Sequence, residues 1–541
     1  MTTADPVAAL RAAVADAADE LSGNGSRQSF SFDRPPKPEF GDYSTNAPML
    51  LAPSLGEQPR AVAERLGGLV ADRLAGELDR VDVAGPGFLN LFVSDAWCRQ
   101  ALSSALAAVD DFGRGRPAVA ERVLVEFVSA NPTGPVTVAS ARHAAYGDAL
   151  SRILELAGHQ VEREYYVNDE GGQVRSFGES IRARARGEEP PEGGYHGAYV
   201  VELAQRIDGA ADADPDLLAR RGVELMIDGV KATLERFRVH MDRFFFEHAV
   251  HEGGGIDRAI GLLQQAGHVY EHEGALWLRT TSFGDDKDRV LRRSAGEYTY
   301  FGADIGYHAN KLERALDRYI NVLGADHHGY VGRLLAAWEA LGGQRDRLEL
   351  LIMQLVNLVE RGQRVQMSKR AGEFVALDDL VDDIGVDAAR FFLLQRSHDT
   401  TLDLDLALAR EESQENPVYY VQYAHARIAS ILRRVEPERV EGALSAAYRE
   451  TLHPSARALL KRLLEFPDEV ERAAARRAPH RLTTYVHDVV QDFSAFYRDC
   501  RVVGAAEEGG DEDFRIALSV FAQRVIARSL DLLGVAAPEQ M

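Results

Sequence analysis

A strand, a turn and a helix follow one another at residues 123–158, and this unit constrains the fold more than any other feature of the chain. Residues 123–128 read VLVEFV, the β-branched, apolar run that is typical of a buried parallel strand. The turn NPTGP comes next, and from about Thr137 apolar residues recur at helical spacing until Gly158. Such a unit is half of a βαβ motif, because parallel strands are joined by helical crossovers. The sequence therefore predicts an α/β domain built on a doubly wound parallel sheet.

Further signals extend this pattern to about residue 395 and then stop. Residues 160–167 (QVEREYYV) and 318–326 (RYINVLGAD) have the character of strands, and a charged helical region lies between them at about 172–247. Beyond residue 396 strand signals nearly vanish, which predicts an all-helical domain. Residues 1–113 combine helical stretches with a turn-rich segment and a strand-like run, which predicts a small α/β domain.

The length of the chain requires several domains, because 541 residues exceed what one hydrophobic core supports. We predict an N-terminal α/β domain at 1–113 and a Rossmann-like domain at 114–395, with an inserted segment at about 172–280. The predicted helical domain occupies residues 396–541.

Charge and cysteine content exclude several classes of protein. The net charge of −22 excludes a protein that coats nucleic acid by bulk charge, although local patches could still bind it. No apolar run is long enough to span a membrane, and the N-terminus carries acids where a signal peptide carries bases, so we expect a cytoplasmic protein. Cys98 and Cys500 are too far apart in sequence to suggest a disulfide framework or a cysteine-rich zinc site. Any metal is therefore expected to arrive with a substrate.

Blocks of sequence along nearly the entire chain resemble those of the arginyl-tRNA synthetases, and they occur in that family's order. These class I enzymes use ATP to join arginine to its tRNA. An ordered set of blocks is far more specific than a lone motif. The blocks are VEFVSANPTGPVTVASAR (125–142), YYVNDEGGQV (165–174), FGDDKDRVL (283–291), YTYFGADIGYH (298–308), GADHHGYV (324–331), VQMSKRAGEFV (365–375), GVDAARFF (385–392) and NPVYYVQYAHARI (416–428).

The resemblance implies a ligase that takes L-arginine, tRNA and ATP with Mg²⁺ as substrates and has no structural metal. It also implies that the helical domain binds the anticodon and that the N-terminal domain meets the outer corner of the tRNA. We expect a monomer without membrane association.

Residues 367–370 (MSKR) match the mobile loop that holds the triphosphate of ATP in this family. A lysine ammonium suits that role because it can reach phosphate oxygens as a point charge. The resemblance assigns Lys369 and Ser368 to catalysis, and both residues together with Met367 to ATP binding. Gln366 stands where the fuller family motif has a lysine, so one of the two expected cations is missing.

A guanidinium requires carboxylates that accept its planar fork of donors. By resemblance, Glu126 and Asp304 bind the side chain of arginine and Tyr300 stands beside them. Glu126 could instead be a structural strand residue paired with an arginine, and Tyr300 could be a core residue. Both interpretations of Glu126 require a cationic partner, because a carboxylate inside an apolar strand must be paired.

The remaining substrate contacts also rest on the resemblance. Ser129 and Asn131 are assigned to the amino and carboxylate end of arginine, and either His327 or His328 reaches the same end. Gly324 and Asp326 end a strand, where an acid can hold the ribose hydroxyls of ATP.

The helix after NPTGP departs from the family pattern. The family has H-x-G-H there, two histidines on one face of the first turn that donate to the phosphates, whereas this chain has Thr137 and Ser140 at those two positions. Both hydroxyls keep the spacing, and His143 lies one turn further on the same face, so we assign part of the catalytic role to these three residues. The alternative is that Thr137 merely caps the helix and Ser140 is solvated.

Two interpretations of the whole chain follow from this departure. The protein is either a working arginyl-tRNA synthetase with a diverged signature or a descendant that binds tRNA or arginine without aminoacylation. We favour the working enzyme, because the arginine pocket, the MSKR loop and the anticodon domain all keep their patterns. A third interpretation is a generic nucleotide-binding α/β enzyme, which tRNA binding would distinguish.

The helical domain supplies three candidates for anticodon contacts. By resemblance these are Tyr420, Tyr497 and the terminal Met541. Aromatic faces can stack on splayed bases. Core packing is the alternative for the two tyrosines, and a frayed end is the alternative for Met541.

Overall fold

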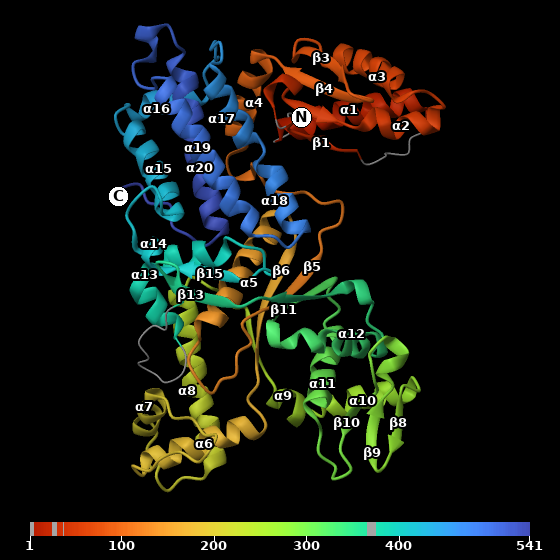
Figure 1. Ribbon diagram of the computed structural model, residues 1–541, viewed down its shortest axis with the longest axis vertical. Coiled ribbons are helices and arrows are strands. Elements are labelled where there is room, and N and C mark those ends of the chain that lie inside the picture. The colour runs from red at the N-terminus through yellow and green to blue at the C-terminus, as the bar shows by residue number, and fades with distance from the viewer. Residues whose placement is uncertain (1–4, 24–29, 36, 365–374) are drawn as a thin grey trace.

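The structure is a computed structural model, and it describes residues 5–23, 30–35, 37–364 and 375–541. A parallel sheet occupies the middle of the molecule. The N-terminal domain and the helical domain lie side by side at one end, and two lobes project at the other end (Figure 1). None of the described helices is long and apolar enough to cross a membrane.

The N-terminal domain is an antiparallel sheet of order β1-β2-β4-β3 with helices packed on it. Strands β3 and β4 form a hairpin, whereas β2 and β4 pair although α2, α3 and β3 lie between them in the chain. The elements are α1 (Pro6–Ser22), β1 (Phe32–Asp33), β2 (Tyr43–Thr45), α2 (Ala47–Leu55), α3 (Pro59–Arg73), β3 (Leu78–Ala84), β4 (Phe88–Val93) and α4 (Asp95–Ala108).

The central sheet has the order β12-β11-β5-β6-β7, and all of its pairs are parallel. The predicted doubly wound sheet is therefore confirmed. Helix α5 leads from β5 to β6, whereas β11 lies on the other side of β5, so a crevice opens at the carboxyl ends of β5 and β11. The elements are β5 (Arg122–Glu126), α5 (Val138–Leu156), β6 (Gln160–Val167), β7 (Arg243–Phe246), α11 (Tyr300–Glu313), β11 (Arg318–Gly324), α12 (Val331–Ala340) and β12 (Leu348–Met353).

Two lobes extend from the carboxyl edge of this sheet. The first is helical, with α6 (Gly172–Ala185), α7 (Ala198–Arg206) and α8 (Pro215–Arg236). The second contains an antiparallel sheet that the sequence analysis missed, with a small core of its own. Its strands have four residues each, and β8 and β10 contain charged side chains, so they show no long apolar alternation. The elements of the second lobe are α9 (His248–Glu252), α10 (Gly255–Gln265), β8 (Val269–His272), β9 (Ala275–Leu278) and β10 (Arg289–Arg292).

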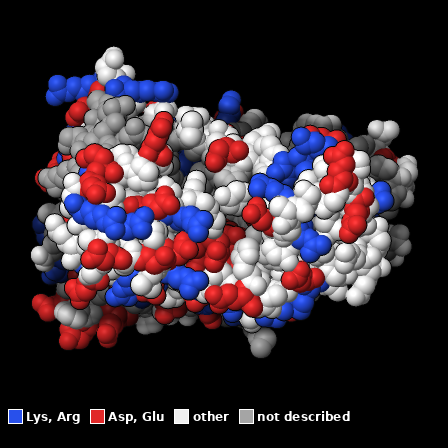
Figure 2. Space-filling view, turned by 90° about the horizontal axis from the view of Figure 1, so that it is seen from below, with Lys and Arg blue, Asp and Glu red and all other residues white. Residues whose placement is uncertain are grey.

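The lobes do not present one basic face. Over the described residues, Lys and Arg side chains lie among Asp and Glu side chains on the face seen from below (Figure 2). This mixture agrees with the exclusion of nucleic-acid binding by bulk charge.

The prediction that the chain is all-helical from residue 396 is wrong at its start. Strand β15 lies inside the range predicted to be all-helical and pairs in parallel with β13, so the uninterrupted helices begin only at α14. The strand escaped the sequence analysis because LDLD has only four residues, two of them acidic. The elements of this connection are β13 (Val356–Glu360), β14 (Gln363–Arg364), α13 (Leu377–Leu394) and β15 (Leu402–Asp405).

The helical domain packs against both α5 and the N-terminal domain. Two ion pairs join it to the N-terminal domain: the buried Lys461 contacts Asp42 at 2.5 Å, and the half-buried Arg457 contacts Asp95 at 2.5 Å. Its helices are α14 (Leu406–Arg410), α15 (Pro417–Leu432), α16 (Pro437–Leu444), α17 (Pro454–Leu464), α18 (Phe466–Ala475), α19 (His480–Asp499) and α20 (Glu512–Leu532).

Candidate active site

Glu126 ends strand β5 at the crevice, and three side chains donate hydrogen bonds to its carboxylate. The residue is 6% exposed, and its carboxylate accepts hydrogen bonds from Lys311 Nζ at 2.5 Å, Tyr307 Oη at 3.1 Å and Ser129 Oγ at 3.1 Å. Burial alone would raise the pKa of Glu126, but the Lys311 ammonium outweighs it and holds the pKa below its usual range. The cation that the sequence analysis required is therefore Lys311 of α11 and not an arginine.

Asp304 lies on α11 and differs from Glu126 in having no cation. Its carboxylate accepts a hydrogen bond from the hydroxyl of Tyr330, and within the described residues no Lys or Arg lies at ion-pair distance from it. Burial raises the pKa of Asp304 to about 6, and the nearby charges of Glu247 and Glu126 contribute to the shift. A carboxylate that is shielded from water and has no cation beside it is stabilised in its ionised form by any cation that enters the site.

Glu247 is a third carboxylate at this site, and the sequence analysis missed it. The residue follows β7, is buried, and lies 3.3 Å from His251 Nε2. It faces the hydroxyl of Tyr166, whose pKa is raised by burial and then by the Glu247 charge. The sequence does carry a signal for this residue: Glu247 directly follows the apolar run FFF, just as Glu126 lies within the apolar run VLVEFV.

Aromatic rings line the space beside these carboxylates. The ring of Tyr307 lies 4.3 Å from that of Tyr166 and 5.0 Å from that of Phe245, measured between centroids. Tyr300 is 64% exposed at the start of α11, which contradicts core packing. Carboxylates beside aromatic faces suit a planar guanidinium, because its edge donates hydrogen bonds and its face stacks.

The turn after β5 brings the predicted contacts for the amino and carboxylate end to the same crevice. Val128 and Ser129 both have positive φ, a strained conformation that is found mainly where the surrounding structure requires it. Ser129 Oγ also accepts a hydrogen bond from the Tyr166 amide at 3.1 Å. The side chain of Asn131 donates to Gln173 Oε1 at 2.8 Å, so α6 helps to position it.

The first turn of α5 is capped by a hydroxyl. Thr137 is the N-cap, and its Oγ1 accepts a hydrogen bond from the Ser140 amide at 3.4 Å. Capping is therefore a role that the geometry supports directly. Burial, followed by the charge of Arg142, lowers the pKa of His143 to about 4. His143 is neutral at pH 7, so favourable potential at this helix start comes from backbone N–H groups and not from an imidazolium.

The short 3₁₀ helix at Ala325–Tyr330 holds the predicted ATP and histidine contacts. Asp326 and His327 are exposed there, and His327 Nδ1 lies 3.1 Å from Asp326 Oδ1. A Cβ at Gly324 would lie 2.5 Å from Asp326 Oδ1, so a larger residue here would displace the exposed Asp326 side chain. His327 lies close enough to Asp304 and to His143 that its charge lowers the pKa of each. This proximity favours His327 over His328 as the residue that faces the crevice. Met367, Ser368 and Lys369 lie outside the described residues.

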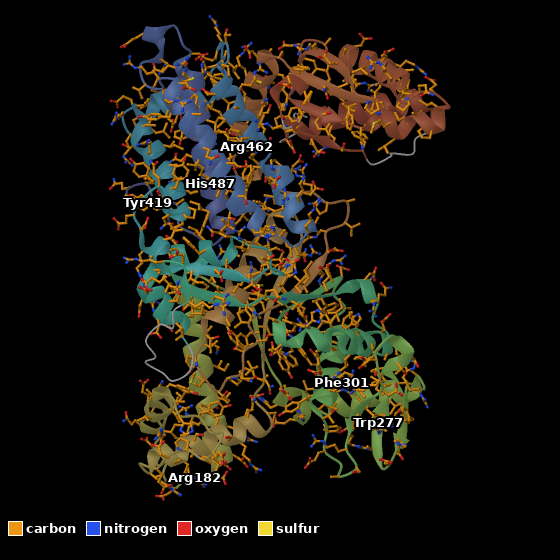
Figure 3. All side chains as sticks on the ribbon, in the orientation of Figure 1. Arg182, Trp277, Phe301, Tyr419, Arg462 and His487 are labelled. Carbon is orange, nitrogen blue, oxygen red and sulfur yellow. The ribbon has the colours of Figure 1, made fainter. Side chains whose placement is uncertain are left out.

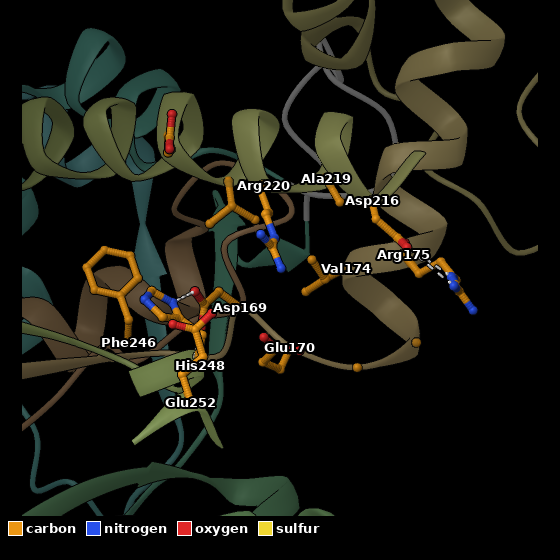
Figure 4. A pocket seen from close by; sticks show the side chains of 14 residues that line it. Asp169, Glu170, Val174, Arg175, Asp216, Ala219, Arg220, Phe246, His248 and Glu252 are labelled. Carbon is orange, nitrogen blue, oxygen red and sulfur yellow. Dashed lines mark hydrogen bonds and ion pairs between the residues drawn. The ribbon is translucent and has the colours of Figure 1, made fainter. Parts of the chain in front are cut away.

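An open cavity of about 610 Å³ lies beside the crevice that holds Glu126 and Asp304, between α6, α8 and β7 (Figure 4). Its wall carries an Asp169–His248 hydrogen-bonded pair, together with Arg220 and Phe246. A Cβ at Gly171, which also lines the cavity, would lie 3.5 Å from the Tyr300 hydroxyl, so the cavity and the crevice adjoin.

The predicted anticodon contacts lie on the helical domain, far from the lobes. Tyr419 and His487 of this domain lie at the opposite side of the molecule from Phe301, the neighbour of Tyr300 (Figure 3). Tyr420 packs its ring 5.5 Å from that of His487. Tyr497 is partly exposed, with the Arg427 guanidinium 5.6 Å from its ring centroid.

The chain terminus is held on the same surface. His425 Nδ1 of α15 lies 2.8 Å from the carbonyl oxygen of Pro538, and an Arg433 guanidinium donates to the Glu539 carbonyl at 3.1 Å. These contacts argue against a frayed end. Met541 is 55% exposed beside them.

Family models match three separate parts of the chain. An arginyl-tRNA synthetase N-terminal domain matches residues 8–93, the catalytic domain of class I tRNA synthetases (R) matches 215–427, and a DALR anticodon-binding domain matches 421–541. A relative named arginine–tRNA ligase from Frankia alni is 45% identical over 99% of this chain and 98% of its own length. The chain belongs to the arginyl-tRNA synthetase family.

Other relatives agree with this assignment. Arginine–tRNA ligases from Clavibacter sepedonicus and Carboxydothermus hydrogenoformans are 43% and 40% identical over 100% and 99% of the chain, and 100% and 97% of their own lengths. A solved structure from Campylobacter jejuni, described as an arginyl-tRNA synthetase, is 32% identical with a TM-score of 0.77 and covers 83% of this chain and 100% of its own. The Thermus thermophilus arginyl-tRNA synthetase shares the fold, with 24% identity, a TM-score of 0.77, and coverage of 99% and 100%.

The three family matches leave residues 94–214 uncovered. This range includes the turn at which Thr137 and Ser140 replace the two family histidines. The assignment to the arginyl-tRNA synthetases therefore rests on the rest of the chain and on the full-length relatives.

Proposed function

We propose that the protein is an arginine–tRNA ligase, which attaches L-arginine to its tRNA through an arginyl-adenylate. One observation carries the proposal: three carboxylates, the buried Glu126 and Glu247 and the half-buried Asp304, converge at the crevice, and Lys311 is the one Lys or Arg among the described residues that pairs with any of them. The site thus holds more negative charge than its own cations balance. A guanidinium supplies the missing charge and the donors to satisfy it.

Binding of the guanidinium would place the other end of arginine at the turn after β5. In our proposal Ser129 and Asn131 hold its amino and carboxylate groups, with His327 beside them. The carboxylate then attacks the α-phosphate of ATP and pyrophosphate leaves. Holding these two groups in line is the main contribution to the rate, because little covalent chemistry falls to side chains.

ATP is proposed to lie over the carboxyl ends of β5 and β11. Asp326 would hold the ribose hydroxyls, and Gly324 would leave room for them. The N-terminal N–H groups of α5 and the hydroxyls of Thr137 and Ser140 would face the phosphates. By family resemblance, Met367, Ser368 and Lys369 complete this site, and Mg²⁺ arrives on the triphosphate.

The tRNA is proposed to bridge the two ends of the molecule. Its acceptor end would enter the crevice, and its anticodon would reach the surface formed by Tyr420, Tyr497 and Met541. The exposure of Tyr497 and Met541 and the fixed position of the C-terminus support this placement. We further propose that the N-terminal domain meets the outer corner of the tRNA and that the enzyme acts as a cytoplasmic monomer.

The test of this function is ATP–pyrophosphate exchange with each of the twenty amino acids, with and without tRNA. Exchange is expected with arginine alone, and it should be nearly silent without tRNA, as is general in the family. Exchange driven by a different amino acid, or no exchange under any condition, would contradict the proposal. Binding without aminoacylation has no support from the relatives, which bear the name of the ligase.

Ser140→Ala tests the diverged signature. If the Ser140 hydroxyl donates to the transition state, the variant should lower kcat and kcat/KM together by about 100-fold, with ATP affinity nearly unchanged. Thr137→Ala is the comparison: if Thr137 acts only as the N-cap, its loss should cost about 1 kcal/mol of stability and leave activity per folded molecule intact. Turnover of Ser140→Ala equal to wild type at saturating ATP and tRNA would rule out the catalytic role.

A further inference from the structure

Arg142 is a fully buried arginine without a carboxylate partner. It lies on α5, and no ion pair among the described residues includes it. Desolvation lowers its pKa to about 10, so it remains charged at pH 7. Burial of an unpaired charge costs free energy unless hydrogen bonds compensate for it, so the hydrogen-bond partners of this guanidinium decide whether it is stable here.

The compensation comes from backbone carbonyls of two separate segments. Nη1 donates to the carbonyl of Gln354 at 2.8 Å and of Thr400 at 2.9 Å, and Nη2 donates to that of Ser397 at 2.9 Å. The Arg396 carbonyl lies 3.5 Å from Nη2. A planar guanidinium can hold several acceptors in one fixed geometry, which an ammonium on a flexible stem cannot reproduce.

These segments meet at the carboxyl end of β12. Gln354 directly follows β12, and the last residue of β12 is in register with Gly324 of β11. Residues 396–400 precede β15, and the His398 carbonyl accepts a hydrogen bond from the Gln354 amide at 2.8 Å. Arg142 therefore joins the helix that starts at Thr137 to the strand ends beside Gly324.

The first turn of α5 has a second connection, to the backbone of residues 375–377. The Val138 amide donates to the Val375 carbonyl at 3.0 Å, and the Leu377 amide donates to the Val136 carbonyl at 2.8 Å. These contacts hold the turn itself, whereas Arg142 holds the helix one turn further along. Two points of attachment fix the direction of the helix as well as its position.

We propose that Arg142 is a positioning residue that sets the distance across the crevice between the start of α5 and the ends of β11 and β12. It acts through Thr137, Ser140 and the N–H groups of the first turn, and it touches no substrate. This inference rests on the proposed ligase function. A displacement of about 1 Å between reacting groups can cost about 100-fold in rate, so loss of Arg142 should affect turnover far more than arginine binding, whose carboxylates lie on other elements.

The experiment compares Arg142→Met, Arg142→Lys and Arg390→Lys with wild type. Arg390 is the control, because it is also fully buried and bonds backbone carbonyls, those of Phe237 and Leu533. Unlike Arg142 it pairs with a carboxylate, that of Asp148 on α5, and it bonds neither Gln354 nor residues 396–400. Equilibrium dialysis with labelled arginine and tRNA counts competent sites, and tRNA-dependent exchange is expressed per site. Arg142→Met should keep the arginine Kd and lose turnover per site by about 10- to 100-fold.

Arg142→Lys should restore part of the turnover at pH 7 and lose it again as the pH rises toward 9. The reason is that a buried, unpaired ammonium has a lowered pKa and stops donating when it deprotonates. Wild type and Arg390→Lys should keep their turnover per site over the same range. A loss of stability alone would reduce the number of sites and not the rate per site.

Wild-type turnover per site in Arg142→Met would overturn the inference, as would an equal loss in Arg390→Lys. If Arg142→Met does not fold, Arg142→Lys decides, and a rate per site equal to wild type from pH 7 to 9 would overturn it. Absence of arginine-dependent exchange in wild type would instead contradict the proposed function, so the two failures are distinguishable.

Discussion

Replacement of Asp304 by asparagine is expected to lower kcat/KM for arginine by about 100-fold or more. Asparagine keeps the shape and the acceptor for the Tyr330 hydroxyl, so the change removes mainly the charge. Removing one member of a buried charge pair costs about 3 to 5 kcal/mol, and each 1.4 kcal/mol is about tenfold. The measurement is tRNA-dependent exchange at pH 7.5, with citrulline as the uncharged analogue that wild type should reject.

The pH dependence gives a second readout of the same carboxylate. Burial raises the pKa of Asp304 to about 6 in the free protein, and arginine binds the ionised form. The KM for arginine in wild type should therefore rise as the pH falls through 6, and Asp304→Asn should lack this rise. Asp257→Asn is the control, since Asp257 also accepts a tyrosine hydroxyl but lies exposed on α10. An unaltered kcat/KM in Asp304→Asn would contradict the assignment.

Replacement of Lys311 by methionine is expected to destabilise the sheet domain by about 3 to 5 kcal/mol. Lys311 is fully buried, and its ammonium pairs with Glu126 and donates to Asn321 Oδ1 at 2.9 Å. Methionine fills much of the same volume, so the cost comes from the carboxylate and the amide that lose their donor. Urea unfolding at pH 7 measures the effect as a lower transition midpoint.

The control for this prediction removes both charges. The double variant Lys311→Met, Glu126→Gln leaves no unpaired ion in the interior and should recover much of the lost stability. A midpoint in the single variant equal to that of wild type would show that Glu126 is satisfied without its lysine.

The central part of the fold could be predicted from the sequence because its signals are local. The run at 123–128 and the helix after Thr137 carry strong periodic patterns, and the structure places β5 and α5 there. Strands β8–β10 and β15 were missed because a strand of four residues is too short to show a clear periodic pattern, and charged residues in β8, β10 and β15 weaken the signal further.

The crevice that holds Glu126 and Asp304 was predictable only in part, for a different reason. Glu126 and Asp304 stand in recognisable blocks of sequence, but the partners that set their charge states do not. Lys311 lies 185 residues after Glu126 in the chain, and Glu247 follows β7. Only tertiary packing brings them together at the crevice. Sequence reasoning could require a cation beside Glu126 but could not choose which one.

The measurement that tests the account most directly is the transfer of labelled arginine to tRNA by the purified protein with ATP. A working ligase should give acid-precipitable, arginine-specific charging of tRNA that depends on ATP and is lost in Asp304→Asn. Tight binding of arginine and tRNA with no charged product at any enzyme concentration would contradict it and would favour a protein that binds tRNA without aminoacylating it.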